Sequence, residues 1–278
     1  MRSSGTRHQR NGTEIVRHSL KGCAPAWMPV VAIALLGLLL PVGADAEVIP
    51  LSSVNAAVLL GTDQTAARPT SADAAWTAEI VRSVVARTAP SIAAGSRTTL
   101  QPYTLGPSPT RLLATRGFRD RRNNDWVRVQ LNIRPNETTA WVPADAVILT
   151  ATDTRIVIHL ASRRLDVWRG SRHVLSVPAG IGTAATPTPT GQFAIDDIWE
   201  TDAETRGMYG RFVLALTAHS NVLLHFAGGD GRIAIHGGGA PGRVGARSSF
   251  GCVIVAAPVL QRLSRMARPG TPVTVLTG

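Results

Sequence analysis

The sequence predicts a mainly β protein: a β-sandwich or barrel with one or two short helices, preceded by a small β subdomain. Two observations predict this class. From residue 153 to the C-terminus, short runs rich in Val and Ile follow one another with turn residues between them, and no helical pattern alternates with them. From residue 110 to 150, shorter runs alternate apolar and polar residues, as half-buried strands do.

Residues 1–46 are predicted to direct export and to stand apart from the folded part. A basic leader precedes an almost wholly apolar stretch, residues 28–42, and Ala44 and Ala46 form the small-x-small pattern of a cleavage site. The apolar stretch approaches the length of a membrane span, so a cleaved signal peptide and an N-terminal membrane anchor both stay open. In both cases we expect the rest of the chain to be exported to the periplasm or cell wall.

The charge of the chain is strongly basic, with a formal net charge of +11. Almost all of this charge comes from Arg, because Lys21 is the only lysine. The arginines are spread along the chain, and no basic patch interleaved with aromatic residues is found in the sequence, which argues against a nucleic-acid partner. An anionic cell envelope matches an exported basic protein better.

Residues 47–109 read as a linker rich in Ala, Thr, Ser and Pro. Within it, residues 74–87 are a possible short helix, because their apolar side chains fall near one face at helical spacing. Residues 110–150 then predict a small β subdomain, with strands at 111–114, 126–131, 140–142 and 146–149 and a turn at 134–137.

Residues 153–278 are predicted to form the main domain. Residues 156–158 and 164–168 read as a hairpin, and residues 258–266 read as a helix that begins near Pro258 and ends before Pro269 and Gly270. Further strands are expected at residues 173–177, 193–195, 233–235, 253–255 and 272–276.

The candidate site joins His236 to Cys252. The apolar run 233–235 predicts a buried strand that ends at His236, and a loop rich in Gly leads to Cys252, 16 positions further on. The chain has two cysteines, and Cys23 lies in the leader, so Cys252 has no partner for a disulfide within an exported mature protein. A thiol beside an imidazole is a nucleophile beside its base.

These residues carry a resemblance to a known family. Ala179-Gly-Ile-Gly182, Thr188-Pro-Thr-Gly-Gln-Phe193, Ile235-His236-Gly237 and Ser249-Phe-Gly-Cys-Val253 occur in the order found in the catalytic domain of L,D-transpeptidases. These are exported bacterial enzymes that cross-link peptidoglycan through a cysteine. The region 110–150 resembles, over about forty residues, the last strands of bacterial SH3-like wall-binding domains; a β subdomain that only packs on its neighbour is the alternative.

The resemblance implies roles for the residues of the motifs. Cys252 is the expected nucleophile, His236 its base, and the carbonyl of Gly237 the group that holds the other imidazole nitrogen. Gly251 and the Cys252 N–H are expected at the oxyanion, Ser249 in the orientation of the loop, and Tyr209 at the border of a substrate groove. Two positions depart from the family pattern: Phe250 replaces a His, and Ile254 replaces an Arg or Asn.

The function that the resemblance implies is peptidoglycan L,D-transpeptidation, a transferase reaction in cell wall organisation and cell shape. The expected partners are tetrapeptide stems and the cell wall, with acylation by penem-type β-lactams. Two alternatives stay open: an L,D-carboxypeptidase, and a non-catalytic wall-binding scaffold with a degenerate domain. No cofactor is expected. His219, His225, His236 and Cys252 are zinc-ligand types, but their spacing matches no compact metal motif. We expect His219 and His225 to be structural or to line the groove, and His159 and His173 to occupy surface or satisfied core positions.

Overall fold

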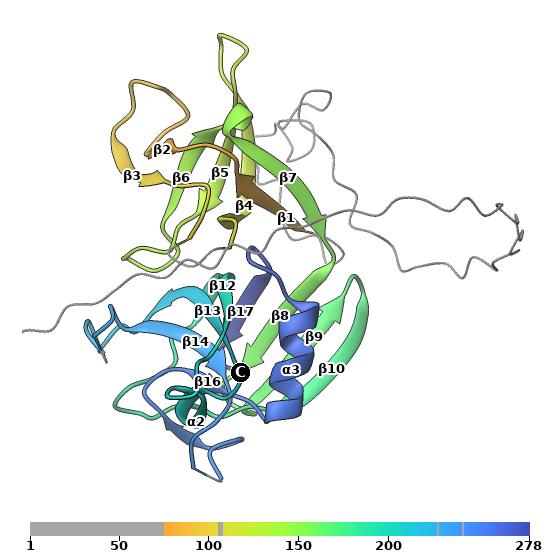
Figure 1. The fold of residues 1–278 in the computed structure, drawn as a ribbon. Coiled ribbons are helices and arrows are strands. Elements are labelled where there is room, and N and C mark those ends of the chain that lie inside the picture. The colour runs from red at the N-terminus through yellow and green to blue at the C-terminus, as the bar shows by residue number, and fades with distance from the viewer. Residues whose placement is uncertain (1–74, 105–107, 227, 241) are drawn as a thin grey trace, which may run out of the picture. The chain divides into compact units, whose positions relative to one another are not determined.

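Two β-sheets built from successive parts of the chain make up the fold (Figure 1). The computed structural model describes residues 75–104, 108–226, 228–240 and 242–278. The predicted leader, and the predicted linker up to residue 74, lie outside the described residues. We call the seven-stranded sheet of residues 75–152 the first sheet, and the eight-stranded sheet of residues 154–276 the second sheet.

The first sheet has the strand order β3-β2-β6-β5-β4-β1-β7. All of its pairs are antiparallel. A single 3₁₀ turn, η1 (Ala144–Ala146), leads into its last strand. The strands are β1 (Ala75–Ile80), β2 (Val84–Arg87), β3 (Ser96–Leu100), β4 (Arg111–Arg119), β5 (Asp125–Gln130), β6 (Thr139–Pro143) and β7 (Val147–Thr152).

The prediction of a helix at residues 74–87 is wrong, since this segment forms β1 and β2. Strand β1 lies between two partners, with Trp76 opposite Ala114 on β4 and Ala151 on β7. Its backbone is therefore hydrogen-bonded on both edges, and this pairing overrides the helical spacing of its apolar residues. The small β subdomain consequently begins near residue 75 and not at residue 110, and the residues from 75 to 100 are sheet and not linker.

The core of the first sheet is made by alternate residues of its strands. Val127 and Val129 of β5 are fully buried in it, as the alternation of that strand predicted. Ala78 and Ile80 of β1 and Val84 and Ala86 of β2 are buried in the same cluster. The period-2 burial of these four residues shows why the segment is stable as strand: each inward side chain reaches the same core.

The second sheet has the strand order β10-β9-β8-β17-β12-β13-β14-β16. A separate two-stranded ribbon pairs β11 with β15, and two helices complete the described part of this half. These elements are β8 (Thr154–His159), β9 (Arg164–Arg169), β10 (Arg172–Pro178), β11 (Ile181–Gly182), β12 (Gly191–Glu200), α2 (Arg206–Tyr209), β13 (Phe212–His219), β14 (Arg232–His236), β15 (Arg247–Ser249), β16 (Val253–Ile254), α3 (Ala257–Met266) and β17 (Pro272–Leu276).

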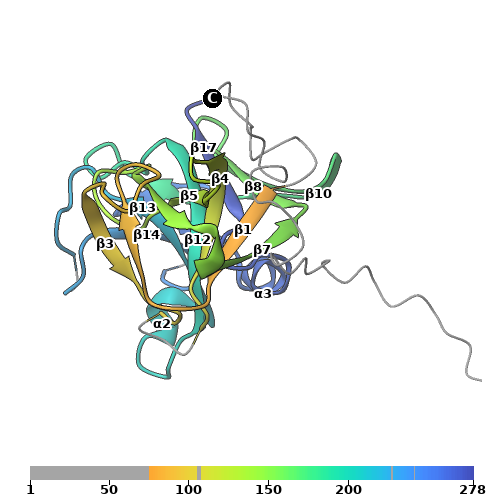
Figure 2. The ribbon, with the colours of Figure 1, turned by 90° about the horizontal axis from the view of Figure 1, so that it is seen from above.

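The predicted strands and the predicted helix of residues 153–278 are confirmed. The hairpin β8–β9 turns at residues 160–163, and the helix α3 begins with Pro258 in its first turn. Leu260 and Leu263 of α3 are buried in the core of the second sheet; Figure 2 views this helix along its axis. Among the described residues, no helix combines the length and the apolar character needed to span a membrane.

The two sheets contact each other through polar side chains of the first and backbone of the second. The Gln130 side-chain amide donates to the carbonyl of Gln192 at 2.6 Å, and the Gln192 N–H donates to the Glu137 carboxylate at 2.8 Å. A small apolar cluster of Ala75, Leu113 and Ala194 lies at the same boundary. The first sheet is therefore bonded directly to β12, a central strand of the second.

Candidate active site

Strands β14 and β16 bring His236 and Cys252 together. The two strands are parallel neighbours, with Ile235 opposite Val253 and His236 opposite Ile254. Cys252 directly precedes β16, so it lies level with Ala234, whose backbone forms a hydrogen bond with its thiol. Ala234 and His236 are two residues apart on one strand, and their side chains share a face. The strand register therefore places His236 and Cys252 on neighbouring segments of the second sheet.

His236 is held as a neutral imidazole of one tautomer. Its Nδ1 lies 2.7 Å from the carbonyl oxygen of Gly237. Because a carbonyl only accepts, Nδ1 carries the proton and Nε2 keeps a free lone pair. Burial lowers the pKa of His236; the Gly237 hydrogen bond opposes this shift, and the positive charge of Arg243 adds to it. The imidazole is thus ready to accept a proton at Nε2.

Cys252 is held as a thiol and not as a thiolate. Burial raises the pKa of Cys252, while the hydrogen bond with the Ala234 backbone and the charge of Arg243 lower it in part. The described structure shows Cys252 as a free thiol. Because the thiolate is the reactive form, this cysteine needs a base at the moment of attack.

The turn before Cys252 is fixed by Ser249. The Ser249 hydroxyl donates to the carbonyl of Cys252 at 2.6 Å and accepts from the N–H of Gly251 at 3.2 Å. Gly251 has φ +117°, and a Cβ there would lie 2.8 Å from Cδ1 of Ile233. Glycine at this position therefore meets both a backbone and a packing requirement. Its N–H is already used within the turn, which leaves the Cys252 N–H as the candidate oxyanion donor.

A threonine-rich turn braces the same backbone from the other side. The Thr188 hydroxyl donates to the carbonyl of Gly251 at 2.8 Å and accepts from the N–H of Gly182 at 2.9 Å. The Thr186 hydroxyl donates to the carbonyl of Ser249 at 3.1 Å. These contacts give a structural reason for the Gly and Thr motifs upstream of the His and Cys motifs.

Tyr209 packs against His236, with the two rings edge-to-face at a centroid distance of 5.1 Å. Its carbonyl accepts from the N–H of Gly237 at 2.8 Å. A Cβ at Gly238 would lie 2.6 Å from the backbone nitrogen of Gly210. The run of glycines after His236 therefore lets the α2 turn approach closely and bring Tyr209 to the imidazole.

The two departures from the family pattern have different surroundings. Phe250 is 58% exposed and stacks on Phe226 at a centroid distance of 5.1 Å. Ile254 is buried, and its backbone exchanges two hydrogen bonds with Gly180. An apolar side chain at residue 254 thus fits the interior, whereas the aromatic ring at residue 250 forms part of the surface.

Arg243 is the site residue that the sequence did not reveal. Its guanidinium donates to the carbonyl of Ser248 at 3.2 Å, and its charge reaches both His236 and Cys252. The sequence feature that could have identified Arg243 is its position as a basic residue in the glycine-rich segment between His236 and Cys252. Arg247, the first residue of β15 in the same His-to-Cys segment, gave an equal signal, but its side chain extends toward the carbonyl of Leu160 at 3.4 Å.

The remaining histidines of the second sheet have other partners or lie on the surface. His219 is buried with its Nε2 2.9 Å from the Asp230 carboxylate, and burial lowers its pKa against the effect of that carboxylate. His159 and His173 flank Asp166 at 3.2 and 3.3 Å. His225 is exposed.

In a comparison with known protein families, residues 153–275 match the family model YkuD, whose description is L,D-transpeptidase catalytic domain. No curated protein matches the sequence. Three solved structures similar to the chain are all L,D-transpeptidases. An L,D-transpeptidase from Enterococcus faecium, in a mutant form, is 22% identical with a TM-score of 0.35, over 45% of this chain and 50% of that chain.

The second, an L,D-transpeptidase from Mycobacterium smegmatis, is 18% identical with a TM-score of 0.34, over 55% of this chain and 91% of that chain. The third, the E. faecium catalytic domain acylated by ertapenem, is 22% identical with a TM-score of 0.33, over 45% of this chain and 98% of that chain. The match spans about half the length of the longer E. faecium protein. Residues 153–275 of this chain therefore match the family of L,D-transpeptidase catalytic domains.

Proposed function

We propose that this chain is a peptidoglycan L,D-transpeptidase that joins the third residues of two peptide stems through a thioester on Cys252. The observation that carries the proposal is the fixed tautomer of His236, whose Nδ1–H donates to the Gly237 carbonyl at 2.7 Å on the strand next to Cys252. A base needs a free lone pair beside the proton that it removes, and this arrangement leaves one on Nε2.

The first half-reaction is acyl transfer to the enzyme. The carbonyl carbon is that of the amide between the third residue and the terminal D-residue of a tetrapeptide stem. Sγ of Cys252 attacks this carbon while Nε2 of His236 takes the thiol proton. The tetrahedral intermediate then collapses: the C–N bond breaks, His236 returns the proton to the leaving amine, and the D-amino acid departs. The stem remains as a thioester on Cys252.

The second half-reaction releases the stem. The side-chain amine of an acceptor stem attacks the thioester carbon, and His236 removes a proton from the attacking nitrogen. When the C–S bond breaks, the proton returns to the sulfur and Cys252 is restored as a thiol. If water takes the place of the amine, the same site acts as an L,D-carboxypeptidase.

Two further groups have roles in this scheme. The Cys252 N–H is proposed to stabilise the oxyanion, because Ser249 fixes the Cys252 peptide at its carbonyl and occupies the neighbouring N–H of Gly251. Arg243 is proposed to bind a substrate carboxylate, because its charge reaches both reacting side chains. Such a contact would hold an anionic stem over the thiol.

The setting of the reaction is proposed to be the cell envelope. We propose export through the leader 1–46 to the periplasm or cell wall, where stems are found. We also propose that penem-type β-lactams acylate Cys252. The solved catalytic domain from E. faecium carries an ertapenem adduct, and this supports the choice of drug class for a test.

A non-catalytic wall-binding scaffold is the alternative from another class. Phe250 favours it, because a His is usual at that position of the family pattern. Ile254 no longer does, because the structure buries it in the interior next to Gly180. Both reactive side chains are retained in an ordered site, which favours the enzyme.

Product analysis tests the proposal. The full chain carrying Cys23→Ser, so that Cys252 is its only thiol, is incubated with a disaccharide-tetrapeptide, and the products are separated and weighed. We expect a dimer together with free D-amino acid. A tripeptide without dimer would assign the carboxypeptidase alternative.

Matched variants distinguish the site from other histidines. Cys252→Ala and His236→Ala should abolish the products, whereas His225→Ala, which removes an exposed imidazole, should retain them. Unchanged substrate with folded protein would contradict the enzyme and favour the scaffold.

A further inference from the structure

Phe226 and Phe250 form an exposed aromatic pair that the proposed chemistry does not use. Phe226 is 41% exposed and Phe250 is 58% exposed, and their rings are tilted by 37° at a centroid distance of 5.1 Å. They come from two different connections of the second sheet, one after β13 and one before β16. Contiguous apolar side chains that are exposed to solvent are typical of surfaces that bind a ligand or another protein.

Phe250 has a fixed position relative to the nucleophile. Only Gly251 separates it from Cys252 in the sequence, so their Cα atoms are at most about 7 Å apart. The Ser249 hydroxyl bonds both the Gly251 N–H and the Cys252 carbonyl, and Thr186 bonds the Ser249 carbonyl. A molecule bonded to Sγ is therefore attached to the same fixed turn that carries Phe250.

Phe226 lies on the connection between β13 and β14, residues 220–231, of which all but residue 227 are described. Phe226 and Gly229 exchange backbone hydrogen bonds of 3.0 and 2.8 Å, which form a tight turn. At the base of the connection, the Ser220 N–H donates to the carbonyl of Gly231 at 2.8 Å. The position of the Phe226 ring thus depends on how the backbone between Ser220 and Gly231 is held.

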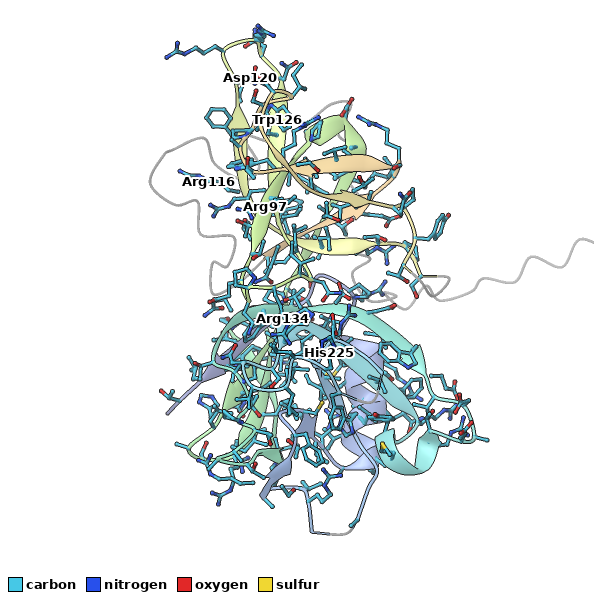
Figure 3. The ribbon with its side chains drawn as sticks, turned by 90° about the vertical axis from the view of Figure 1, so that its left-hand side faces the viewer. Arg97, Arg116, Asp120, Trp126, Arg134 and His225 are labelled. Atoms are coloured by element: carbon cyan, nitrogen blue, oxygen red, sulfur yellow. The ribbon has the colours of Figure 1, made fainter. Side chains whose placement is uncertain are left out.

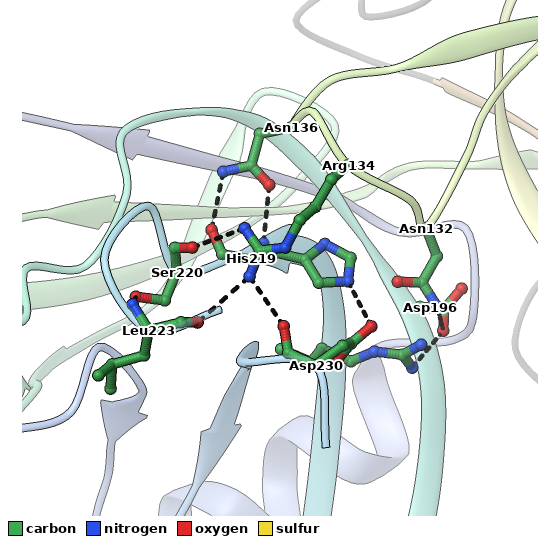
Figure 4. Close-up of polar contacts among 9 residues, drawn as sticks. Asn132, Arg134, Asn136, Asp196, His219, Ser220, Leu223 and Asp230 are labelled. Atoms are coloured by element: carbon green, nitrogen blue, oxygen red, sulfur yellow. Dashed lines mark hydrogen bonds and ion pairs between the residues drawn. The ribbon is translucent and has the colours of Figure 1, made fainter. Parts of the chain in front are cut away.

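Arg134 of the first half of the chain holds that backbone. Its guanidinium donates to the carbonyls of Ser220 at 2.7 Å, Leu223 at 3.2 Å and Asp230 at 2.8 Å (Figure 4). Figure 3 shows Arg134 where the two sheets meet. Asn136 bonds the N–H and the carbonyl of His219 at 2.7 and 2.8 Å, at the end of β13.

Arginine suits this task better than lysine. A planar guanidinium presents several N–H groups in a fixed fork, so one side chain bonds three carbonyls at once, whereas an ammonium is a point donor on a flexible stem. The three carbonyls belong to both limbs of the connection, since Ser220 and Leu223 precede Phe226 and Asp230 follows it. Arg134 therefore closes the connection across its base.

We propose that Phe226 and Phe250 form an apolar subsite beside the Cys252 thiol, and that Arg134 is the positioning residue that holds it in place. The subsite takes an apolar or aromatic group of a molecule that reacts at Cys252. The role of this molecule as an acyl substrate rests on the proposed function, but the existence of the subsite does not. A reacting molecule is the expected occupant because the fixed turn from Ser249 to Cys252 joins the subsite to the nucleophile.

The test measures how Cys252 selects between two small electrophiles. The full chain carrying Cys23→Ser is alkylated with N-phenylmaleimide and with N-methylmaleimide, and each rate is divided by the rate with glutathione. We expect the normalised phenyl-to-methyl ratio to be about three to ten in the unchanged site, the range of an aromatic contact. The ratio should fall to about one in Phe226→Ala/Phe250→Ala.

Variants of Arg134 test the positioning role. Arg134→Ala and Arg134→Lys should both lower the ratio toward one, and Arg134→Ala should add nothing in the Phe226→Ala/Phe250→Ala background, because the effect passes through the rings. Arg82→Ala, which removes one exposed ion pair with Asp145 in the first half, is the matched control and should keep the ratio. Thermal unfolding identifies the variants that fold, and Arg134→Lys decides the question if Arg134→Ala does not.

Three outcomes would overturn the proposal. One is a ratio of one in the unchanged site. Another is an unchanged ratio in a folded Arg134→Lys protein. The third is a dimer at the assay concentration that Phe226→Ala/Phe250→Ala dissociates, since the rings would then bind a second copy. None of these readouts needs stem peptides, so failure of transpeptidation with an intact ratio would contradict the proposed function alone.

Discussion

The side chain of His236 and the carbonyl of the next residue, Gly237, are joined by a hydrogen bond of 2.7 Å. This contact decides which nitrogen of the imidazole carries the proton. The group that orients the imidazole is therefore a backbone carbonyl and not a carboxylate. A carbonyl adds no negative charge, so it stabilises an imidazolium less than an aspartate would.

The acid limit of activity follows from the pKa of His236. Burial lowers this pKa below the ordinary value of about 6.5, so the imidazole stays neutral and able to accept a proton in mildly acidic solution. We expect the rate of Cys252 acylation to fall only below pH 6.5, as His236 becomes protonated. Single-turnover acylation measured across pH checks this. A half-maximal rate at or above pH 6.5 would contradict the assigned environment of the imidazole.

The charge of Arg243 should affect the Cys252 thiol directly. Arg243 lowers the pKa of Cys252 against the effect of burial, so Arg243→Gln should raise that pKa further and slow alkylation by iodoacetamide several-fold at neutral pH. Arg247→Gln is the matched control, since Arg247 lies four residues further on, at the start of β15, and extends toward the Leu160 carbonyl. Equal rates for the two variants would show that Arg243 does not act on the thiol.

Substitution of Gly251 should destabilise the protein. A side chain at φ +117° with its Cβ 2.8 Å from Ile233 strains both backbone and packing, at a cost of about 1–3 kcal/mol in the free energy of unfolding. Gly207→Ala is the control, because nothing lies within 4 Å of a Cβ built there. We expect Gly251→Ala to lower the melting temperature by several degrees by calorimetry and Gly207→Ala to leave it nearly unchanged. Similar melting temperatures would refute the packing account of this turn.

The sequence predicted the second sheet far better than the beginning of the first. In residues 153–278, each expected strand is a local run of β-branched residues, and α3 carries its own start and stop signals at Pro258 and Gly270. The strands β1 and β2 have no comparable local signal. Strand β1 is paired on both sides by β4 and β7, which follow much later in the sequence, whereas β2 pairs with the next strand, β3, and at Arg87 with the distant β6.

The sequence predicted the residues at the centre of the candidate site but not those at its border. His236, Gly237, Ser249 and Cys252 stand in short motifs whose order places them together. Arg243 and Phe226 lie on irregular connections between strands, and Arg134 contacts the β13–β14 connection from the other half of the chain. No local pattern reports such contacts, because they depend on where loops lie after the sheets have formed.

Removal of the Ser249 hydroxyl should affect both stability and reaction. Ser249→Ala loses the 2.6 Å bond to the Cys252 carbonyl and leaves the Gly251 N–H without this acceptor, which costs about 1–3 kcal/mol. The acylation rate should fall as well, because the Cys252 peptide is no longer fixed. Ser264→Ala is the control, since it removes an exposed hydroxyl that bonds only to Gln261 within α3. Chemical unfolding and single-turnover acylation measure the two effects, and an unchanged rate in Ser249→Ala would contradict the orienting role.

Intact-mass spectrometry of the full chain, carrying Cys23→Ser, after brief incubation with a disaccharide-tetrapeptide shows whether Cys252 is the nucleophile and His236 its base. The account predicts an adduct of the stem without its terminal residue, located on Cys252. It also predicts that the adduct forms about 10²–10⁴ times more slowly in His236→Ala, the range expected for loss of a general base. An adduct that persists in Cys252→Ala, or one that forms at the same rate without His236, would contradict the claim that these two side chains act as nucleophile and base.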